Sequence, residues 1–481
     1  MIVMKFGGTS VEDAAAIARV ADIVRTRAGD APVVVVSALA KVTDHLLACG
    51  RAAAGGDRDS ALELGSELRQ RHRRTASELL PATHLPALQS KFEKYFDLLD
   101  ELLIRISGLQ ELSARNTDHL LSFGELLSSE MVAAAFEARG LRCAQVDARE
   151  CIITDDSHTR AQPLFEETRA RLRRSLLPLI EKACIPVMGG FIASTRDGVP
   201  TTVGRGGSDY SASIVGAALG ATRIEIWTDV PGVMTTDPNL CPDARLIQEI
   251  SFEEATELAS FGAKVLHPAT LLPAVENNIP VYVLNSRDPQ GTGTCIRARA
   301  PRSRNPVRAI AVKRGITIVN VSGKRAWMPR GFLRSVFATL DRHDCAVDVV
   351  SSSQVRISLA VESCEAVADL VLDLQEFAEV TCEPQQAIVS VVGENLRGRK
   401  GIAARVFASV AEASVNVRMI SQGASELNIS FVVEEADVPA AVRRLHADLF
   451  TTTQMEGSWR WVRSGHAREA AEEFMLRAEE S

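Results

Sequence analysis

Short apolar runs alternate with helix-length stretches through the first three-fifths of the chain. Five such runs are rich in β-branched side chains and are bounded by small residues: 3–6, 33–36, 185–188, 223–227 and 281–284. Short apolar runs separated by helical patterns are typical of buried strands in an α/β sheet. Between them, residues 58–139 are charged, Leu-rich and nearly free of β-branched runs. We expect a helical excursion there that covers part of the sheet or forms a lid.

The pattern changes after residue 296. Residues 297–308 contain five arginines and two prolines, and both flanks are apolar. A Pro- and charge-rich interval between apolar regions indicates a linker. A nucleic-acid patch is the alternative, but no aromatic side chains are interleaved with the arginines.

An internal repeat follows the linker. Residues 331–338 align with 401–408, and 347–351 align with 417–421, at the same offset. Each copy is preceded by a strand-like run and continues as helix, strand, strand and helix. This order predicts two βαββαβ units of the ferredoxin-like kind, packed as a pair. Residues 459–481 are Glu-, Ala- and Arg-rich and are expected to be helical.

Composition excludes several classes of protein. The chain has 481 residues, 46% of them hydrophobic, and a formal net charge of -7, which argues against general nucleic-acid binding. Nine cysteines include no CxxC pair, so we expect reduced, buried thiols and neither a zinc ribbon nor a thioredoxin motif. No signal peptide or membrane-spanning run is evident, so we expect a cytoplasmic protein with no membrane partner.

The first candidate site is KFGGTS at residues 5–10, between the first strand and a helix expected from near Val11. Gly7 and Gly8 allow a ligand to approach the backbone, and a helix N-terminus offers free N–H groups. Lys5 adds a charge suited to phosphate oxygens. The lysine precedes the glycines, so this is not a Walker A loop. A solvated Lys5 beside an ordinary turn is the alternative.

The second candidate is GRGGSD at residues 204–209, which opens a helix expected over 210–219. It carries Arg205 and Asp209 and lacks the last glycine of a dinucleotide-binding loop. Ser208 or Asp209 could instead be a plain helix N-cap.

Two further segments extend the candidate site. WTDVPGVMTTDP at residues 227–238 follows a strand, where ligands bind in open α/β sheets, although Pro231-Gly232 also suits a simple turn. FGAKVLHP at residues 261–268 places Lys264 after a glycine that ends a helix.

These four segments together resemble the signatures of aspartokinases, which belong to the amino acid kinase superfamily, and they occur in the family's order. The doubled C-terminal unit resembles the tandem ACT domains of the same enzymes. The resemblance implies an αβα sandwich with a mainly parallel central sheet, followed by two ferredoxin-like ACT domains. The implied domains are 1–296 (kinase), 297–308 (linker), 309–385 and 386–458 (first and second ACT) and 459–481 (tail).

The resemblance also implies an activity: transfer of the γ-phosphoryl group of ATP to the β-carboxylate of L-aspartate. The implied catalytic residues are Lys5, Gly8 and Asp209. The implied substrate-binding residues are Ser37, Thr43, Glu125 and Arg205. The implied ATP-binding residues are Lys5, Gly7, Gly8, Thr228, Asp229 and Lys264. Without the resemblance, Glu125 would be interpreted as an exposed helix charge.

Charge determines the expected mechanism. The β-carboxylate of aspartate has a pKa of about 3.9 and is already ionised at neutral pH, so it needs no general base. Asp209 is therefore expected to organise Lys5 and the metal–phosphate end. Lys5, Mg²⁺ and loop N–H groups would offset the repulsion between carboxylate and phosphate. No cluster of carboxylates is apparent for a protein-held metal, so Mg²⁺ is expected to arrive with ATP.

The ACT region implies feedback regulation by an amino acid and a homodimer formed through the ACT domains. The implied effector-binding residues are Met328, Phe332, Leu333, Val347, Asp348 and Gln354. Asp348 could meet an effector ammonium group. Gln354 replaces a glutamate that often helps to bind lysine, which weakens the prediction of lysine and leaves threonine, another ligand or loss of inhibition open.

Two departures from the family pattern lie on the nucleotide side: Asn239 replaces a common arginine and Met234 a common tyrosine. Loss of the arginine removes a charged phosphate contact. Two alternatives therefore stay open: an amino acid kinase with another substrate, and a non-catalytic sensor that keeps the fold.

Overall fold

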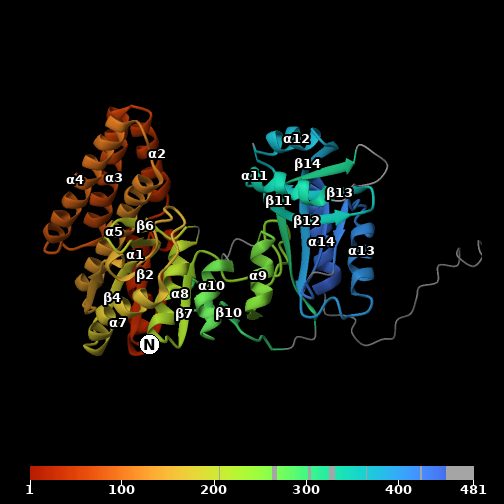
Figure 1. The fold of residues 1–481 in the computed structure, drawn as a ribbon. Coiled ribbons are helices and arrows are strands. Elements are labelled where there is room, and N and C mark those ends of the chain that lie inside the picture. Colours follow the sequence, from red (N-terminus) through yellow and green to blue (C-terminus); the bar gives the residue numbers. More distant parts are fainter. Residues whose placement is uncertain are drawn as a thin grey trace, which may run out of the picture.

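The computed structural model describes residues 1–204, 206–262, 268–301, 305–323, 331–364, 366–422 and 425–450. An N-terminal α/β region and a C-terminal region lie side by side, and helix α9 (Phe252–Ser260) lies between them (Figure 1). Within the described residues no helix is long and apolar enough to cross a membrane.

The N-terminal region is built on an eight-stranded sheet with the order β3-β4-β2-β1-β7-β9-β10-β8. Its pairings are parallel except that between β9 and β10. The five predicted strands are confirmed as β1 (Ile2–Phe6), β2 (Pro32–Val36), β4 (Ile185–Gly189), β7 (Arg223–Thr228) and β9 (Val281–Asn285). The sheet also contains β3 (Cys143–Val146), β8 (Glu249–Ser251) and β10 (Thr294–Arg297), and β5 (Ile192–Ser194) pairs with β6 (Pro200–Thr202) in a separate hairpin.

Helices cover both faces of this sheet, which explains why its central strands are apolar throughout. Alternate residues of β1 enter different cores: Met4 and Phe6 join one, and Val3 joins the other. The first core is completed by α1 (Ala14–Thr26), α2 (Val42–Ala54), α3 (Arg58–Leu79), α4 (Leu85–Leu109) and α5 (Ala114–Ala138). The second is completed by α6 (Ala148–Cys151), α7 (Phe165–Glu181), α8 (Gly207–Leu219), α9 and α10 (Pro268–Glu276).

The helical excursion predicted for residues 58–139 is confirmed. Helix α5 lies against β3 and β4, whereas α3 and α4 pack on each other and on α2. The upper ends of α2, α3 and α4 project beyond the sheet (Figure 1). The excursion therefore covers the sheet through α5.

The C-terminal region is one antiparallel sheet with the order β12-β13-β11-β14-β16-β15. Its strands are β11 (Val307–Gly323), β12 (Val347–Ser352), β13 (Arg356–Glu362), β14 (Ala378–Gly393), β15 (Met419–Ser421) and β16 (Asn428–Glu434). Its helices are α11 (Phe332–Arg342), α12 (Ala366–Gln375), α13 (Ile402–Glu412) and α14 (Val438–Phe450). The predicted repeat of helix, strand, strand and helix is present twice.

The two long strands interlock the repeats. The second half of β11 begins the first repeat, and the first half of β14 closes it. The second half of β14 begins the second repeat, which is closed by residues 307–313 from the first half of β11. The second repeat thus includes a strand that precedes the first repeat in the chain. Two units that simply follow each other along the chain would not have this arrangement.

Cysteine burial was only partly predicted. Cys49, Cys143, Cys151, Cys184, Cys241 and Cys295 are buried free thiols. Cys364 and Cys382 are exposed and Cys345 is half-buried, so the expectation of burial is wrong for these three. They lie in or beside the C-terminal sheet, where its packing leaves them accessible.

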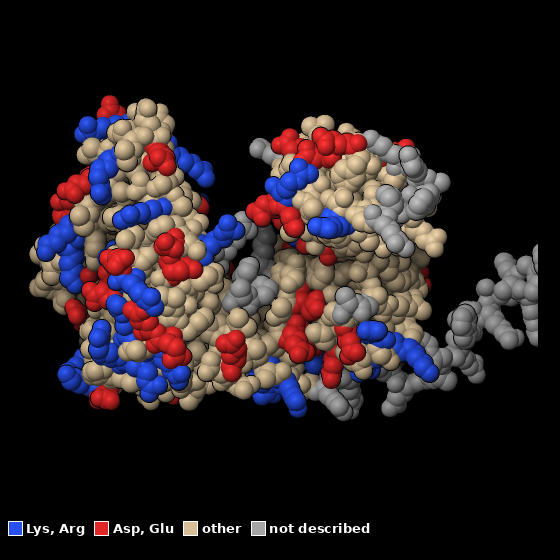
Figure 2. Space-filling view, in the orientation of Figure 1, with Lys and Arg blue, Asp and Glu red and all other residues tan. Residues whose placement is uncertain are grey.

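Charged side chains of both signs are interspersed over the face of the N-terminal region shown in Figure 2. No continuous basic surface is visible there among the described residues. This distribution agrees with the acidic net charge.

A buried histidine makes the helical excursion sensitive to acid. His72 of α3 is fully buried between the rings of Phe92 and Phe96, and its Nδ1 donates to the Leu68 carbonyl at 2.8 Å. Burial lowers the pKa of His72 to about 4. A depressed pKa favours the neutral ring in the folded state, so stability is present above pH 6.5 and is lost as pH falls through 4.

We predict that His72→Leu flattens this part of the acid response. Wild-type protein should lose roughly 3 kcal/mol more unfolding free energy than the variant between pH 7 and pH 4. Urea unfolding at both pH values measures the difference. His84→Gln, outside this aromatic cluster, should behave like wild type; a His72→Leu variant with the same acid response as wild type would contradict the prediction.

Candidate active site

The predicted site residues gather at one edge of the parallel sheet. Strand β1 neighbours β2 on one side and β7 on the other, and the chain order reverses between β1 and β7. Such a switch point leaves a crevice at the carboxyl ends of the strands, where ligands bind in open α/β sheets. Lys5, Ser37 and Thr228 all lie at this edge, at or just beyond the ends of three neighbouring strands.

An ion pair joins two of the predicted motifs. The Nζ of Lys5 lies 2.6 Å from Oδ1 of Asp209, and both side chains are largely buried. Lys5 is therefore not a solvated charge. Helix α8 is capped by Gly206, at φ 68°, with no side-chain cap, so the N-cap interpretation of Ser208 or Asp209 is wrong. Asp209 instead lies in the first turn of α8, where the helix dipole favours a carboxylate.

The glycine turn after β1 begins differently from the prediction. Residues Gly8–Ser10 form a short 3-10 turn (η1), and α1 starts only at Ala14, capped by the Asp13 carboxylate. The helix start predicted near Val11 is therefore wrong, because η1, which begins at Gly8, comes before α1. A Cβ on Gly8 would lie 3.1 Å from the Ala38 carbonyl, so the turns after β1 and β2 pack closely there.

Glu125 lies inside the molecule, not on an exposed helix face. It belongs to α5 and is 3% exposed. Its Oε1 accepts the Ala38 N–H at 3.1 Å, and its Oε2 is buried without a hydrogen-bond partner among the described residues. Burial raises the pKa of Glu125 to about 8, against the opposing effects of the Ala38 N–H and the Lys5 charge. A carboxylate with one unpaired buried oxygen can accept a cationic ligand group.

Ser37 and Thr43 lie on the segment that follows β2. Ser37 is half-buried, and its N–H donates to the Phe6 carbonyl at 3.0 Å. Thr43 is half-buried in the first turn of α2. Because Ala38 binds Glu125, this segment brings both hydroxyl-bearing residues to the same edge as Glu125.

On the other side of β1, Thr228 ends β7, and its Oγ1 donates to the Asp229 carboxylate at 3.2 Å. The Gly7 N–H donates to the Trp227 carbonyl at 3.0 Å, which places the glycine turn against this segment. Asp229 is exposed and accessible to a ligand. The two motifs predicted to bind nucleotide therefore adjoin each other.

The two departures from the family pattern lie further along this segment. Asn239 is exposed and donates through Nδ2 to the Asp237 carboxylate at 3.0 Å. Met234 is half-buried and pairs with Leu246 in a β-bridge. Their effect on ATP binding stays a prediction.

Three predicted site residues lie outside the described residues: Arg205, Lys264 and Met328. The described residues also contain no group of three or more His, Cys, Asp or Glu side chains that could hold a metal ion.

The remaining predicted effector residues belong to the first repeat. Phe332 is buried in α11, whereas Leu333 and Gln354 are exposed and Val347 is half-buried. Both oxygens of Asp348 accept from the Nζ of Lys313, at 2.7 and 2.8 Å. The carboxylate expected to meet an effector ammonium group therefore already holds an ammonium group of this chain.

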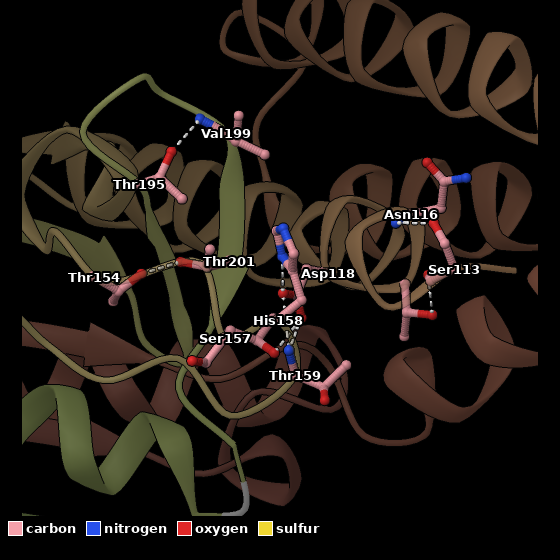
Figure 3. A network of polar contacts seen from close by, with 12 residues as sticks. Ser113, Asn116, Asp118, Thr154, Ser157, His158, Thr159, Thr195, Val199 and Thr201 are labelled. Atoms are coloured by element: carbon pink, nitrogen blue, oxygen red, sulfur yellow. Dashed lines mark hydrogen bonds and ion pairs between the residues drawn. The ribbon is translucent and has the colours of Figure 1, made fainter.

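A buried polar network beside the site was missed from the sequence. Asp118 of α5 is fully buried and accepts from the His158 ring at 2.7 Å, from the Thr159 N–H and from the Thr202 hydroxyl at 2.5 Å. Figure 3 shows Asp118 between His158 and Thr159, which come from the loop between α6 and α7. The network ties α5 to this loop and to β6, which leads into the glycine-rich loop at residue 204.

The sequence held only a weak sign of this role. Asp118 lies two helical turns before Glu125, on the same side of α5. The segment otherwise resembles an ordinary polar helix start. His158 and Thr159 lie in a segment without any recognised motif, so only the fold brings them to Asp118.

A second missed feature is Gly190, just beyond β4. A Cβ at this position would lie 2.7 Å from Cα of Ser208. Gly190 thus lets the first turn of α8, and with it Asp209, approach the end of the sheet.

The chain is similar to known protein families and to proteins of known function. The model of the amino acid kinase family matches residues 1–285, and a model described as ACT domain matches residues 389–449. Aspartokinase 2, chloroplastic, of Arabidopsis thaliana is 37% identical over 466 residues, which cover 94% of this chain and 84% of that protein.

Two solved structures share the whole architecture. The crystal structure of Escherichia coli aspartokinase III in complex with aspartate and ADP (R-state) matches with a TM-score of 0.81 and 35% identity, covering 94% of this chain and 100% of that one. The structure of the same enzyme with lysine and aspartate (T-state) matches with a TM-score of 0.80 at the same identity and coverage.

The Asp118 network leads to a stability prediction. Asp118→Ala removes the acceptor from three donors, of which the Thr202 hydroxyl is buried and the His158 ring and Thr159 N–H are half-buried, and this should lower the unfolding free energy by about 2–4 kcal/mol. Urea unfolding measures the loss. Asp155→Ala is the matched control, because Asp155 accepts from Ser157 and Gln162 within the same loop but does not reach α5. Equal losses in the two variants would show that the link to α5 is not what stabilises this region.

Proposed function

This chain belongs to the aspartokinase family and is an ATP-dependent aspartate kinase, and we propose that the residues at the carboxyl edge of its parallel sheet carry out the reaction. The reaction transfers the γ-phosphoryl group of ATP to L-aspartate and forms 4-phospho-L-aspartate. The observation that supports this assignment is the buried Lys5–Asp209 ion pair beside Glu125, at the switch point of the sheet.

The transfer joins two anions. An oxygen of the aspartate β-carboxylate attacks the γ-phosphorus, a carboxylate O–P bond forms, and the bond from phosphorus to the β,γ-bridging oxygen breaks to release ADP. The carboxylate is ionised at neutral pH, so no proton is removed from it. The obstacle is electrostatic repulsion, which a buried cation and backbone N–H groups reduce as charge redistributes.

Lys5 and the turn from Gly7 and Gly8 supply this positive potential. Asp209 fixes the Lys5 ammonium group, because the pair is largely buried and neither side chain is free to swing into solvent. Mg²⁺ held by the phosphate oxygens of ATP would neutralise part of the nucleotide charge when bound. Thr228 and Asp229 bind the nucleotide on the β7 side, and Lys264 is also assigned to nucleotide binding.

The substrate occupies the β2 side. The unpaired Oε2 of Glu125 accepts the α-ammonium group of aspartate, and Arg205 pairs with its α-carboxylate in bidentate fashion. Ser37 and Thr43 contribute hydroxyl groups at the same edge. Bound this way, aspartate directs its β-carboxylate toward Lys5.

We further propose that an amino acid regulates the enzyme through the C-terminal repeats. The Escherichia coli enzyme matched above was solved with lysine, which makes lysine the first effector to test. An effector ammonium group must displace Lys313 from Asp348 or share that carboxylate, and Gln354 offers no charge to assist it. ADP production with lysine, threonine and both together distinguishes the effectors, and no inhibition by either would contradict this regulation.

A homodimer formed through the C-terminal sheet is the expected assembly. Edge strands β12 and β15 expose Val350 and Ile420, whose burial would favour association. Light scattering of the eluted protein tests it, and a monomeric mass at micromolar concentration would contradict it. The free cysteines fit a reducing compartment, so we propose a cytoplasmic location, which cell fractionation tests.

Lys5 provides the direct test of the electrostatic mechanism. Lys5→Met keeps most of the side-chain volume and removes the charge, and kcat should fall by about two to three orders of magnitude. Coupled measurement of ADP release with aspartate gives the value. Lys91→Met, which breaks the ion pair with Glu130 on the helical excursion, should keep near-normal kcat. Full turnover by folded Lys5→Met protein would refute the mechanism.

Glu125 makes aspartate binding depend on pH. Because its pKa is about 8 without ligand, it is mostly protonated at pH 7, whereas pairing with an ammonium group requires the carboxylate. Aspartate binding at pH 7 should therefore release close to one proton, and KM for aspartate should fall as pH rises from 6 to 8.

Calorimetry in buffers of different ionisation enthalpy, with ADP present, counts the released protons. Glu125→Gln should abolish the release. Glu130→Gln changes another buried glutamate of α5, one paired with Lys91, and should retain it. If the wild type binds aspartate without releasing a proton, Glu125 does not bind the α-ammonium group.

A further inference from the structure

A long hairpin connects the nucleotide side of the active site to the C-terminal region. This hairpin, residues 229–248, leaves β7 after Thr228 and returns to β8. Its two arms pair: the Thr235 N–H donates to the Arg245 carbonyl at 2.8 Å, and the Ile247 N–H to the Val233 carbonyl at 2.9 Å. The paired arms make the hairpin one structural unit.

The base of the hairpin is fixed to the sheet of the kinase domain. The Thr228 carbonyl accepts from both the N–H and the hydroxyl of Ser286. The Val233 N–H donates to the Thr294 hydroxyl at 2.9 Å. The segment that begins with Thr228 and Asp229 is therefore held where the hairpin starts.

The tip of the hairpin packs against the second repeat. Cys241 is 3% exposed and packs in the same apolar core as Leu445 of α14. The Leu240 carbonyl accepts from Nε of Arg443 at 3.0 Å, and an Arg245 guanidinium N–H donates to the Phe450 carbonyl. A displacement of α14 must therefore move this tip or break these contacts.

The contact nearest the nucleotide side is a buried polar pair. Nε2 of His446 lies 2.9 Å from Oγ1 of Thr235, and both residues are buried. The same oxygen accepts the Arg245 N–H at 2.8 Å, and the Thr235 carbonyl accepts the Ile310 N–H. Thr235 is thus bonded to its own hairpin, to β11 and to α14. Its buried hydroxyl has no solvent to replace a lost partner.

We propose that His446 is a positioning residue for the nucleotide: through Thr235 it holds the hairpin so that Thr228 and Asp229 stay in place for ATP. This inference rests on the proposed nucleotide role of those two residues. If His446 has this role, the second repeat increases the affinity for nucleotide even when no effector is bound. An effector that shifts α14 would change nucleotide affinity through the same contact.

Removal of the ring nitrogen tests the proposal. His446→Phe keeps an aromatic ring stacked on Phe450, whose centroid lies 4.7 Å away, and removes the bond to Thr235. We expect KM for ATP and the Kd for ADP to rise by about three- to tenfold, with KM for aspartate unchanged. His446→Gln, which restores a side-chain nitrogen, should recover most of the affinity. Titration calorimetry with ADP gives the Kd independently of turnover.

Three further variants distinguish a positioning role of His446 from a general loss of ligand affinity. Thr235→Val should reproduce the loss of affinity, and the Thr235→Val/His446→Phe double variant should be no weaker than Thr235→Val alone. His343→Phe is the control, since His343 pairs with Asp373 within the first repeat. Unchanged ADP affinity in His446→Phe, or equal losses for ADP and aspartate, would overturn the proposal.

The proposed function fails separately from this inference. If the wild type binds ADP and variants substituted at Thr228 and Asp229 bind it with the same affinity, these two residues have no role in nucleotide binding. That conclusion does not depend on the His446 variants. If those substitutions weaken ADP binding and His446→Phe does not, only the positioning role is lost.

Discussion

The active site depends on the burial of opposite charges at the end of a parallel sheet. Lys5 and Asp209 are far apart in the chain, yet they form a short ion pair in which neither side chain is free in solvent. Leaving either group buried alone would cost several kcal/mol, so the pair holds β1 and α8 in one arrangement. The ammonium group is thereby fixed at the place where we propose that the phosphoryl group is transferred.

Two buried carboxyl groups of α5, those of Asp118 and Glu125, differ in whether their oxygens have hydrogen-bond partners. Asp118 has both of its carboxylate oxygens paired and ties the loop between α6 and α7, and strand β6, to α5. Glu125, two turns along the same helix, keeps one buried oxygen without a partner among the described residues, and its pKa rises to about 8. A satisfied carboxylate stabilises structure, whereas an unsatisfied one is available for a ligand.

The two C-terminal repeats are joined to each other and to the N-terminal region by several kinds of contact. Strands β11 and β14 each run through both repeats, so the backbone of one repeat continues directly into the other. The hairpin from the kinase domain ends in the apolar core of the second repeat. The junction is strengthened by α9, where Glu254 pairs with Arg308 and Glu257 accepts from Asn428. Side chains of the N-terminal and C-terminal regions therefore contact each other directly.

The sequence by itself determined five strands of the N-terminal region, the helical excursion, the repeat and the motifs at the candidate site. Those features depend on local periodicity, on glycine turns and on residue types, which are all visible along the chain. It did not determine that Glu125 is buried, that Asp209 pairs with Lys5 instead of capping α8, or that Asp118, Gly190 and His446 support the site. Each of these depends on contacts between segments far apart in sequence, and only the packing of the sheet, α5, α8 and α14 decided which polar groups lost their water.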